Sequence, residues 1–141
     1  MTEPNSINKL TRKVKILIVD DDISCLELVI HFINCFHAQI FKANDGMEAI
    51  ELFKQNPDLD LIIMDINMPK MDGLKACLEI KKSHPDTKII ANTAYATNYD
   101  HDNIMTAGFN ALLVKPSSKD QFIEMIRKFV DIVPKSPPIG L

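Results

Sequence analysis

Two hydrophobic patterns alternate along this chain of 141 residues. Short apolar runs bounded by turn formers are typical of strands buried on both faces, whereas apolar residues recurring every three or four positions are typical of helices. The runs predict strands at 15–19, 39–43, 61–64, 88–93 and 111–114. The helical spacings predict helices at 23–36, between Gly46 and Pro57, around 74–81, at 98–107 and at 118–133.

This alternation predicts a doubly wound α/β fold. Five strands separated by five helices form a parallel five-stranded sheet covered on both faces, because right-handed crossovers place helices on either side of it. Gly108 is suited to close the helix at 98–107 in a left-handed conformation. We expect a flexible polar lead at 1–13, one folded domain at 14–133 and a proline-rich tail at 134–141.

Composition and charge restrict the function classes. The net charge is −3 and no long basic block is present, which argues against direct binding of nucleic acid. There is no signal-peptide pattern and no apolar run near the ~18 residues of a transmembrane helix, so we expect a cytoplasmic protein without a membrane partner. Cys25, Cys35 and Cys77 fall in predicted helices without zinc-site spacing, which predicts buried or reduced thiols.

Residues of a few reactive types follow the apolar runs. Asp65 ends the run at 61–64, and Asp20, Asp21, Thr93 and Lys115 stand at or just past other strand ends. The C-terminal ends of parallel strands share one edge, where open α/β folds gather their chemistry. Three carboxylates crowded there repel one another unless a cation lies among them, and oxygen ligands of this kind suit Mg²⁺. Phosphoryl transfer to an aspartate is the chemistry this group predicts.

Each of these residues also has a structural explanation. Residues 20–22 are suited to capping the first helix. Thr93 is suited to the polar end of a strand, and Lys115 is suited to a surface position where its charge is solvated. Their joint placement at one edge favours the chemical interpretation. Pro116 directs the chain after Lys115, through a trans or a cis bond.

Four segments carry a family resemblance. They are ILIVDDD, MDINMPKMDG, NTAYA and AGFNALLVKP, each at the end of a predicted strand or around it. Together they resemble the receiver domain of two-component response regulators, over about residues 14–131. The resemblance implies the flavodoxin-like strand order 2-1-3-4-5 that receivers have.

The resemblance also implies a role for each residue. Asp65 would accept a phosphoryl group from a phosphohistidine on a partner histidine kinase or histidine phosphotransfer protein. Asp21, Asp65 and the main-chain carbonyl of Asn67 would ligate Mg²⁺, with Asp20 acting through water, while Thr93 and Lys115 would bind phosphoryl oxygens. The signal would be a population shift that rearranges the face formed by the fourth helix, fifth strand and fifth helix. A downstream effector or a second copy of the chain would read this face.

Three positions modify that expectation. Leu112 stands where receivers usually carry the aromatic residue of the switch, three positions before Lys115. Asn67 and Tyr95 lie two positions beyond Asp65 and Thr93 and, by the resemblance, flank the path of the attacking water. Tyr95 is expected to shield the acyl phosphate and slow its hydrolysis.

Two other functions and three architectures remain open. A magnesium phosphohydrolase of the haloacid dehalogenase type would need a second aspartate where Asn67 stands, and the length of a cap domain. An interaction module that is shaped like a receiver but is not phosphorylated would not need the reactive residues that this chain retains, which are Asp20, Asp21, Asp65, Thr93 and Lys115. The chain could be a stand-alone receiver, a relay that passes phosphate to a phosphotransfer protein, or a receiver of a hybrid kinase, which NTAYA and AGFNALLVKP favour.

Overall fold

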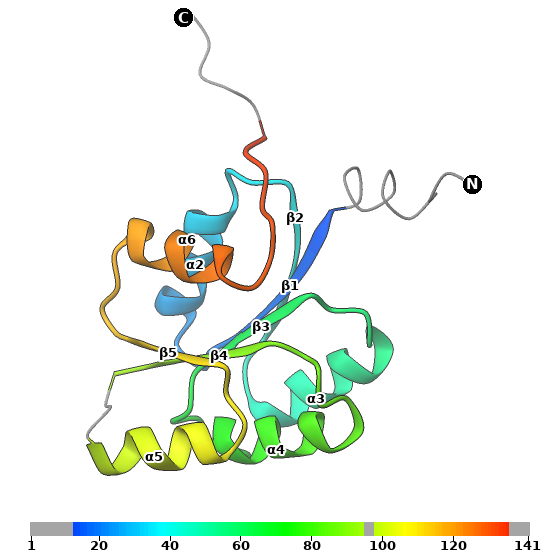
Figure 1. The fold of residues 1–141 in the computed structure, drawn as a ribbon, viewed down its shortest axis with the longest axis vertical. Coiled ribbons are helices and arrows are strands. Elements are labelled where there is room, and N and C mark those ends of the chain that lie inside the picture. The colour runs from blue at the N-terminus through cyan, green and yellow to red at the C-terminus, as the bar shows by residue number, and fades with distance from the viewer. Residues whose placement is uncertain (1–12, 95–97, 136–141) are drawn as a thin grey trace, which may run out of the picture.

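The computed structural model describes residues 13–94 and 98–135, and its centre is one parallel sheet (Figure 1). The strand order is β2-β1-β3-β4-β5, which confirms the predicted doubly wound fold and its flavodoxin-like order. The strands are β1 (Val14–Val19), β2 (Ala38–Ala43), β3 (Leu61–Met64), β4 (Ile89–Thr93) and β5 (Ala111–Val114).

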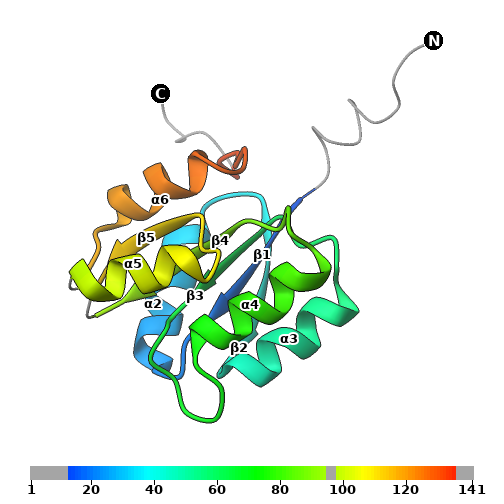
Figure 2. The same cartoon turned by 60° about the horizontal axis from the view of Figure 1, so that its bottom comes forward.

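Helices cover both faces of this sheet (Figures 1 and 2). On one face lie α2 (Ile23–Ile33) and α6 (Lys119–Arg127). On the other lie α3 (Gly46–Gln55), α4 (Gly73–Ser83) and α5 (Asn98–Thr106). Each face has its own apolar core, and every residue of the central strand β3 is buried, as the unbroken apolar run predicted.

Two predicted helices are shorter than expected. The helix at 23–36 ends at Ile33, so Cys35 lies beyond it, and the helix at 118–133 ends at Arg127. The two segments that follow these helices pair with each other, through an antiparallel bridge between Phe36 and Pro134. The amide of His37 donates to the carbonyl of Val133 at 2.7 Å, and the amide of Lys135 donates to the carbonyl of Cys35 at 2.9 Å. These backbone groups therefore bond across the fold instead of extending their helices.

Other local expectations can be compared directly. Gly108 has a φ of 109° just after α5, the left-handed conformation expected of it. Ile23, the apolar residue that begins α2, is 65% exposed. All three cysteines carry free thiols, and burial raises the pKa of Cys77 to about 11. In the described part of the chain, no helix has the length and apolarity needed to cross a bilayer.

Candidate functional site

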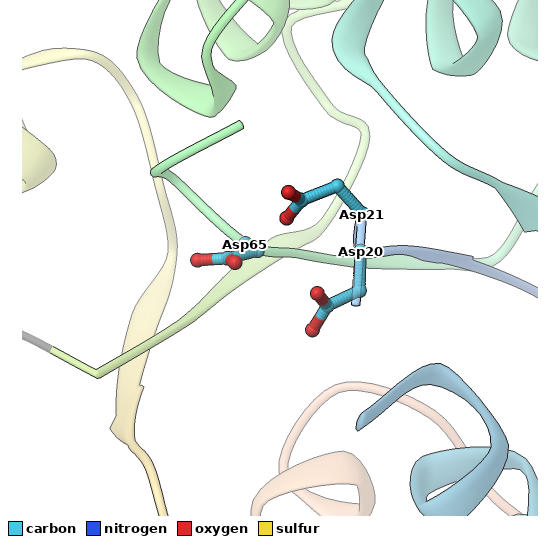
Figure 3. A group of neighbouring side chains, drawn as sticks. All are labelled: Asp20, Asp21 and Asp65. Carbon is cyan, nitrogen blue, oxygen red and sulfur yellow. The ribbon is translucent and has the colours of Figure 1, made fainter. Parts of the chain in front are cut away.

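The carboxyl edge of the sheet brings three aspartates together. Val19 pairs with Met64 in the register between β1 and β3, so the acids that follow the two strands are neighbours. One carboxylate oxygen from each of Asp20, Asp21 and Asp65 lies within 4.8 Å of the others. Figure 3 shows Asp20 turned toward the side of α2 and Asp21 toward the opposite side, with Asp65 beside them. The crowding expected from the sequence is therefore present.

Lys115 bridges two of these acids. Its Nζ lies 2.7 Å from Oδ2 of Asp20 and 3.3 Å from Oδ2 of Asp65. The side chains of Asp20 and Asp65 are only 4% and 9% exposed, so this ion pair is largely shielded from water. Lys115 is therefore an ion-pair partner inside the acidic cluster and not a solvated charge. The peptide bond from Lys115 to Pro116 is cis.

Burial and charge oppose each other at this edge. Burial raises the pKa of Asp65, the charge of Asp20 raises it further, and the Lys115 ammonium only partly opposes them. For Lys115, burial lowers the pKa, but the hydrogen bond that its ammonium donates to Asp20 and the charges of both carboxylates outweigh burial and raise the pKa overall. The lysine is thus held charged while Asp65 carries a proton more readily than an exposed aspartate.

The backbone around Asp65 fixes the direction of its side chain. Its Oδ1 accepts hydrogen bonds from the amides of Ile66 at 2.7 Å and Asn67 at 3.3 Å. Gly73 packs directly on this turn, because a Cβ at residue 73 would lie 2.3 Å from the carbonyl oxygen of Asp65. Only glycine allows α4 to start this close to the acid.

Thr93 and Leu112 lie on the opposite face from Lys115. Thr93 is 1% exposed, and its Oγ1 accepts a hydrogen bond from Nδ2 of Asn67 at 3.4 Å. Leu112 pairs with Ala91 in the register between β4 and β5 and is half-buried against the core beneath α3, α4 and α5. Tyr95, the remaining predicted site residue, lies outside the described residues.

The capping explanation applies to one of the three N-terminal acids. Asp22 is the N-cap of α2 and accepts hydrogen bonds from the amides of Ser24 and Cys25. Asp20 instead accepts from the amide of Asp22 and turns its other oxygen to Lys115. Asp20 and Asp21 therefore belong to the acidic cluster and Asp22 to the helix.

The cluster has the chemistry of a site for a hard divalent cation. Its three donors are carboxylate oxygens, the ligand type that Mg²⁺ takes in proteins. The only charge that the described residues bring into contact with Asp20 and Asp65 is one ammonium, so the three acids retain a net negative charge that a cation would neutralise. The residues present fit the metal that the sequence predicted.

Comparison with known proteins identifies the family. Residues 16–127 match the response regulator receiver domain. The chain belongs to this family. As a receiver it is a signalling domain of two-component phosphorelay systems, which confirms the family resemblance seen in the sequence.

Named relatives show the range of proteins that contain such a domain. The receiver is 33% identical over 127 residues to the transcription factor SKN7 of Chaetomium thermophilum, covering 89% of this chain and 17% of that protein. It is 31% identical over 116 residues to the histidine-protein kinase BarA of Escherichia coli, covering 81% and 12%. The solved CheY-like receiver of Methanospirillum hungatei has a TM-score of 0.76 at 27% identity, covering 82% and 92%. The chain thus spans a small part of these two relatives and nearly all of the solved receiver.

Sequence reasoning missed one polar residue near this edge. Asn92 is 4% exposed, and its Oδ1 has no hydrogen-bond partner among the described residues. The available signal was an amide side chain that interrupts the otherwise apolar run of β4.

Proposed function

We propose that Asp65 is the phosphoryl acceptor of this receiver. The observation that carries the proposal is the Lys115 ammonium in contact with two buried carboxylates, one of which belongs to Asp65. Phosphoryl transfer depends mostly on positioning and neutralisation of charge, and this edge supplies both. A carboxylate oxygen of Asp65 forms the new bond to phosphorus while the bond from phosphorus to the donor histidine nitrogen breaks, and the nitrogen keeps the electron pair.

The neighbouring residues assist this transfer. Asp21, Asp65 and the main-chain carbonyl of Asn67 would hold Mg²⁺, with Asp20 acting through water, and the ion when bound neutralises charge on the phosphoryl oxygens. Lys115 leaves its carboxylates for one phosphoryl oxygen, and the Thr93 hydroxyl donates to another. The domain thereby assists its own phosphorylation and dephosphorylation, and its product is an altered conformation rather than a released metabolite.

The switch works with the hydroxyl of Thr93 and the aliphatic side chain of Leu112. Thr93 gives up its contact with Asn67 when it turns toward the phosphoryl group. The space it leaves is filled by leucine rather than by the ring usual in receivers. The face of α5, β5 and α6 would carry the signal to an effector or a second copy, and it already exposes 40% of Met105 and 48% of Val114.

The phosphoryl donor would be a histidine kinase or a histidine phosphotransfer protein. This follows from the family, whose aspartate takes its phosphoryl group from a phosphohistidine. We place the exchange in the cytoplasm, a reducing compartment that suits the free thiols of Cys25, Cys35 and Cys77.

Intact-mass measurement after incubation with acetyl phosphate and MgCl₂ tests the assignment. A single phosphate gain is expected in the wild type and in Asp86→Asn, a control at an exposed acid, and no gain in Asp65→Asn. A gain that persists in Asp65→Asn would place the acceptor elsewhere. Rapid multiple-turnover release of phosphate would indicate a phosphohydrolase, and no gain in the wild type would indicate an unphosphorylated interaction module.

A further inference from the structure

Asn92 is a buried acceptor without a donor. It lies in β4, where its neighbours Ile89, Ile90 and Ala91 are apolar and fully buried. A buried amide oxygen that makes no hydrogen bond is disfavoured, and natural cores contain few of them. Because Asn92 directly precedes Thr93, we expect another state of the protein in which this oxygen accepts a hydrogen bond.

The sheet register places Asn92 under the path of Lys115. Asn92 pairs with Leu113 of β5, and both Leu113 and Ile90 belong to the core beneath α2 and α6. Side chains alternate along a strand, so Asn92 faces the same side as Ile90. Lys115 lies on that side too, because it is two positions beyond Leu113 and its amide continues the ladder by donating to the carbonyl of Thr93 at 2.8 Å.

The ammonium of Lys115 reaches across β4. Lys115 follows β5, whereas Asp65 follows β3 and Asp20 follows β1, and β4 lies between β5 and β3. Adjacent strands are about 4.8 Å apart, so the side chain spans roughly two strand spacings to meet Asp65. It therefore passes over the end of β4, on the face that Asn92 occupies.

A change of partner would bring the two groups together. An ammonium has three N–H donors, and Asp20 and Asp65 account for two of them in this structure. If Asp20 served a cation instead, Lys115 would lose its shortest contact and keep only the one with Asp65. Its free N–H donors could then turn toward β4, on the face where Oδ1 of Asn92 lies.

We propose that Asn92 is a positioning residue that accepts a hydrogen bond from Lys115 once Asp20 binds a divalent cation. The amide oxygen compensates Lys115 for the lost contact with Asp20 and keeps the ammonium beside Asp65. The inference rests on the proposed function, because it assumes that Asp20 serves Mg²⁺ and that Lys115 serves the phosphoryl group.

Two substitutions of similar volume isolate the acceptor. Asn92→Val removes it, whereas Asn92→Thr keeps a hydroxyl oxygen at nearly the same side-chain size, and both β-branched residues suit a strand. In calorimetric titration with MgCl₂, we expect Asn92→Val to bind roughly three- to tenfold more weakly than the wild type, the effect of one hydrogen bond to a charged donor. Asn92→Thr should stay within about twofold of the wild type.

A double-mutant cycle separates positioning from a general packing role. In a Lys115→Met background, Asn92→Val should change the Mg²⁺ affinity by less than about twofold, because the donor is gone. An equal loss of affinity with and without Lys115 would overturn the inference, as would full affinity in Asn92→Val or absence of Mg²⁺ binding in the wild type.

Unfolding in urea without metal provides a further readout. Asn92→Val should be at least as stable as the wild type, since its oxygen is unbonded in this state. A lower midpoint than that of Asn92→Thr would mean that the oxygen is already bonded and would overturn the inference. These measurements need no phosphorylation, so a wild type that binds Mg²⁺ but gains no phosphate refutes the proposed function alone.

Discussion

Replacing Lys115 by methionine removes the only positive charge that the described residues bring into contact with two buried acids, while keeping a long aliphatic side chain. The ammonium lies 2.7 Å from Asp20 and 3.3 Å from Asp65, and the Lys115 side chain is 18% exposed. Removing one partner of a fully buried ion pair costs about 3–5 kcal/mol, because the remaining charge stays uncompensated. Partial exposure of the lysine screens the pair, so we expect Lys115→Met to lose about 2–3 kcal/mol of unfolding free energy at pH 7.

Mg²⁺ should reverse this loss. In the wild type a cation must displace Lys115 from Asp20, whereas in Lys115→Met the carboxylates have no competing ammonium. We therefore expect Lys115→Met to bind Mg²⁺ about tenfold more tightly than the wild type and to regain most of its stability in excess MgCl₂.

Urea unfolding followed by circular dichroism, with and without MgCl₂, measures both effects. Lys82→Met is the matched control, because Lys82 forms an exposed pair with Glu79 and its side chain is 75% exposed. That pair should contribute less than about 0.5 kcal/mol and respond to no metal. The reasoning is refuted if Lys115→Met is no less stable than Lys82→Met, or if Mg²⁺ restores nothing.

Four further predictions concern pH, packing, capping and phosphate lifetime. The pKa of Lys115 is raised in the folded state, since its carboxylate partners outweigh burial, so its contribution to stability is complete below the ordinary value of 10.5 and is lost as pH rises through the folded-state pKa. Alkaline unfolding monitored by circular dichroism should show this loss in the wild type and not in Lys115→Met. Gly73→Ala places a methyl group against the carbonyl of Asp65, and should cost about 1–3 kcal/mol in urea unfolding and slow phosphate gain; unchanged stability would contradict the close packing. Asp22→Ala should lose about 1 kcal/mol of unfolding free energy and keep its Mg²⁺ affinity in calorimetric titration with MgCl₂. Asp21→Ala should bind Mg²⁺ more weakly in that titration and keep its unfolding free energy. Tyr95→Ala should shorten the lifetime of the acyl phosphate measured by intact mass, and equal lifetimes would refute a shielding role.

The order of elements could be predicted because its signals are local. The apolar run at 61–64 became the buried strand β3, and the spacing of apolar residues identified helices such as α2 and α6. Helix ends could not be predicted in two places, since the amides of His37 and Lys135 bond to carbonyls about 100 positions away in the chain. Such partners leave no periodic pattern near the residues they affect.

The candidate site also has features that could be predicted from the sequence and features that could not. The residues that share the carboxyl edge could be predicted from the sequence, because parallel strands end together. Thr93 is the last residue of its strand, and the other reactive residues come just after theirs: Asp20, Asp21, Asp65 and Lys115. Which of these side chains contact one another follows from the folded arrangement of the strands. The bond from Lys115 to Asp20 joins residues 95 positions apart, and it depends on strand order, register and side-chain reach together. The isolated oxygen of Asn92 likewise follows from packing, since a single amide in an apolar strand has no partner that its neighbours in sequence could reveal.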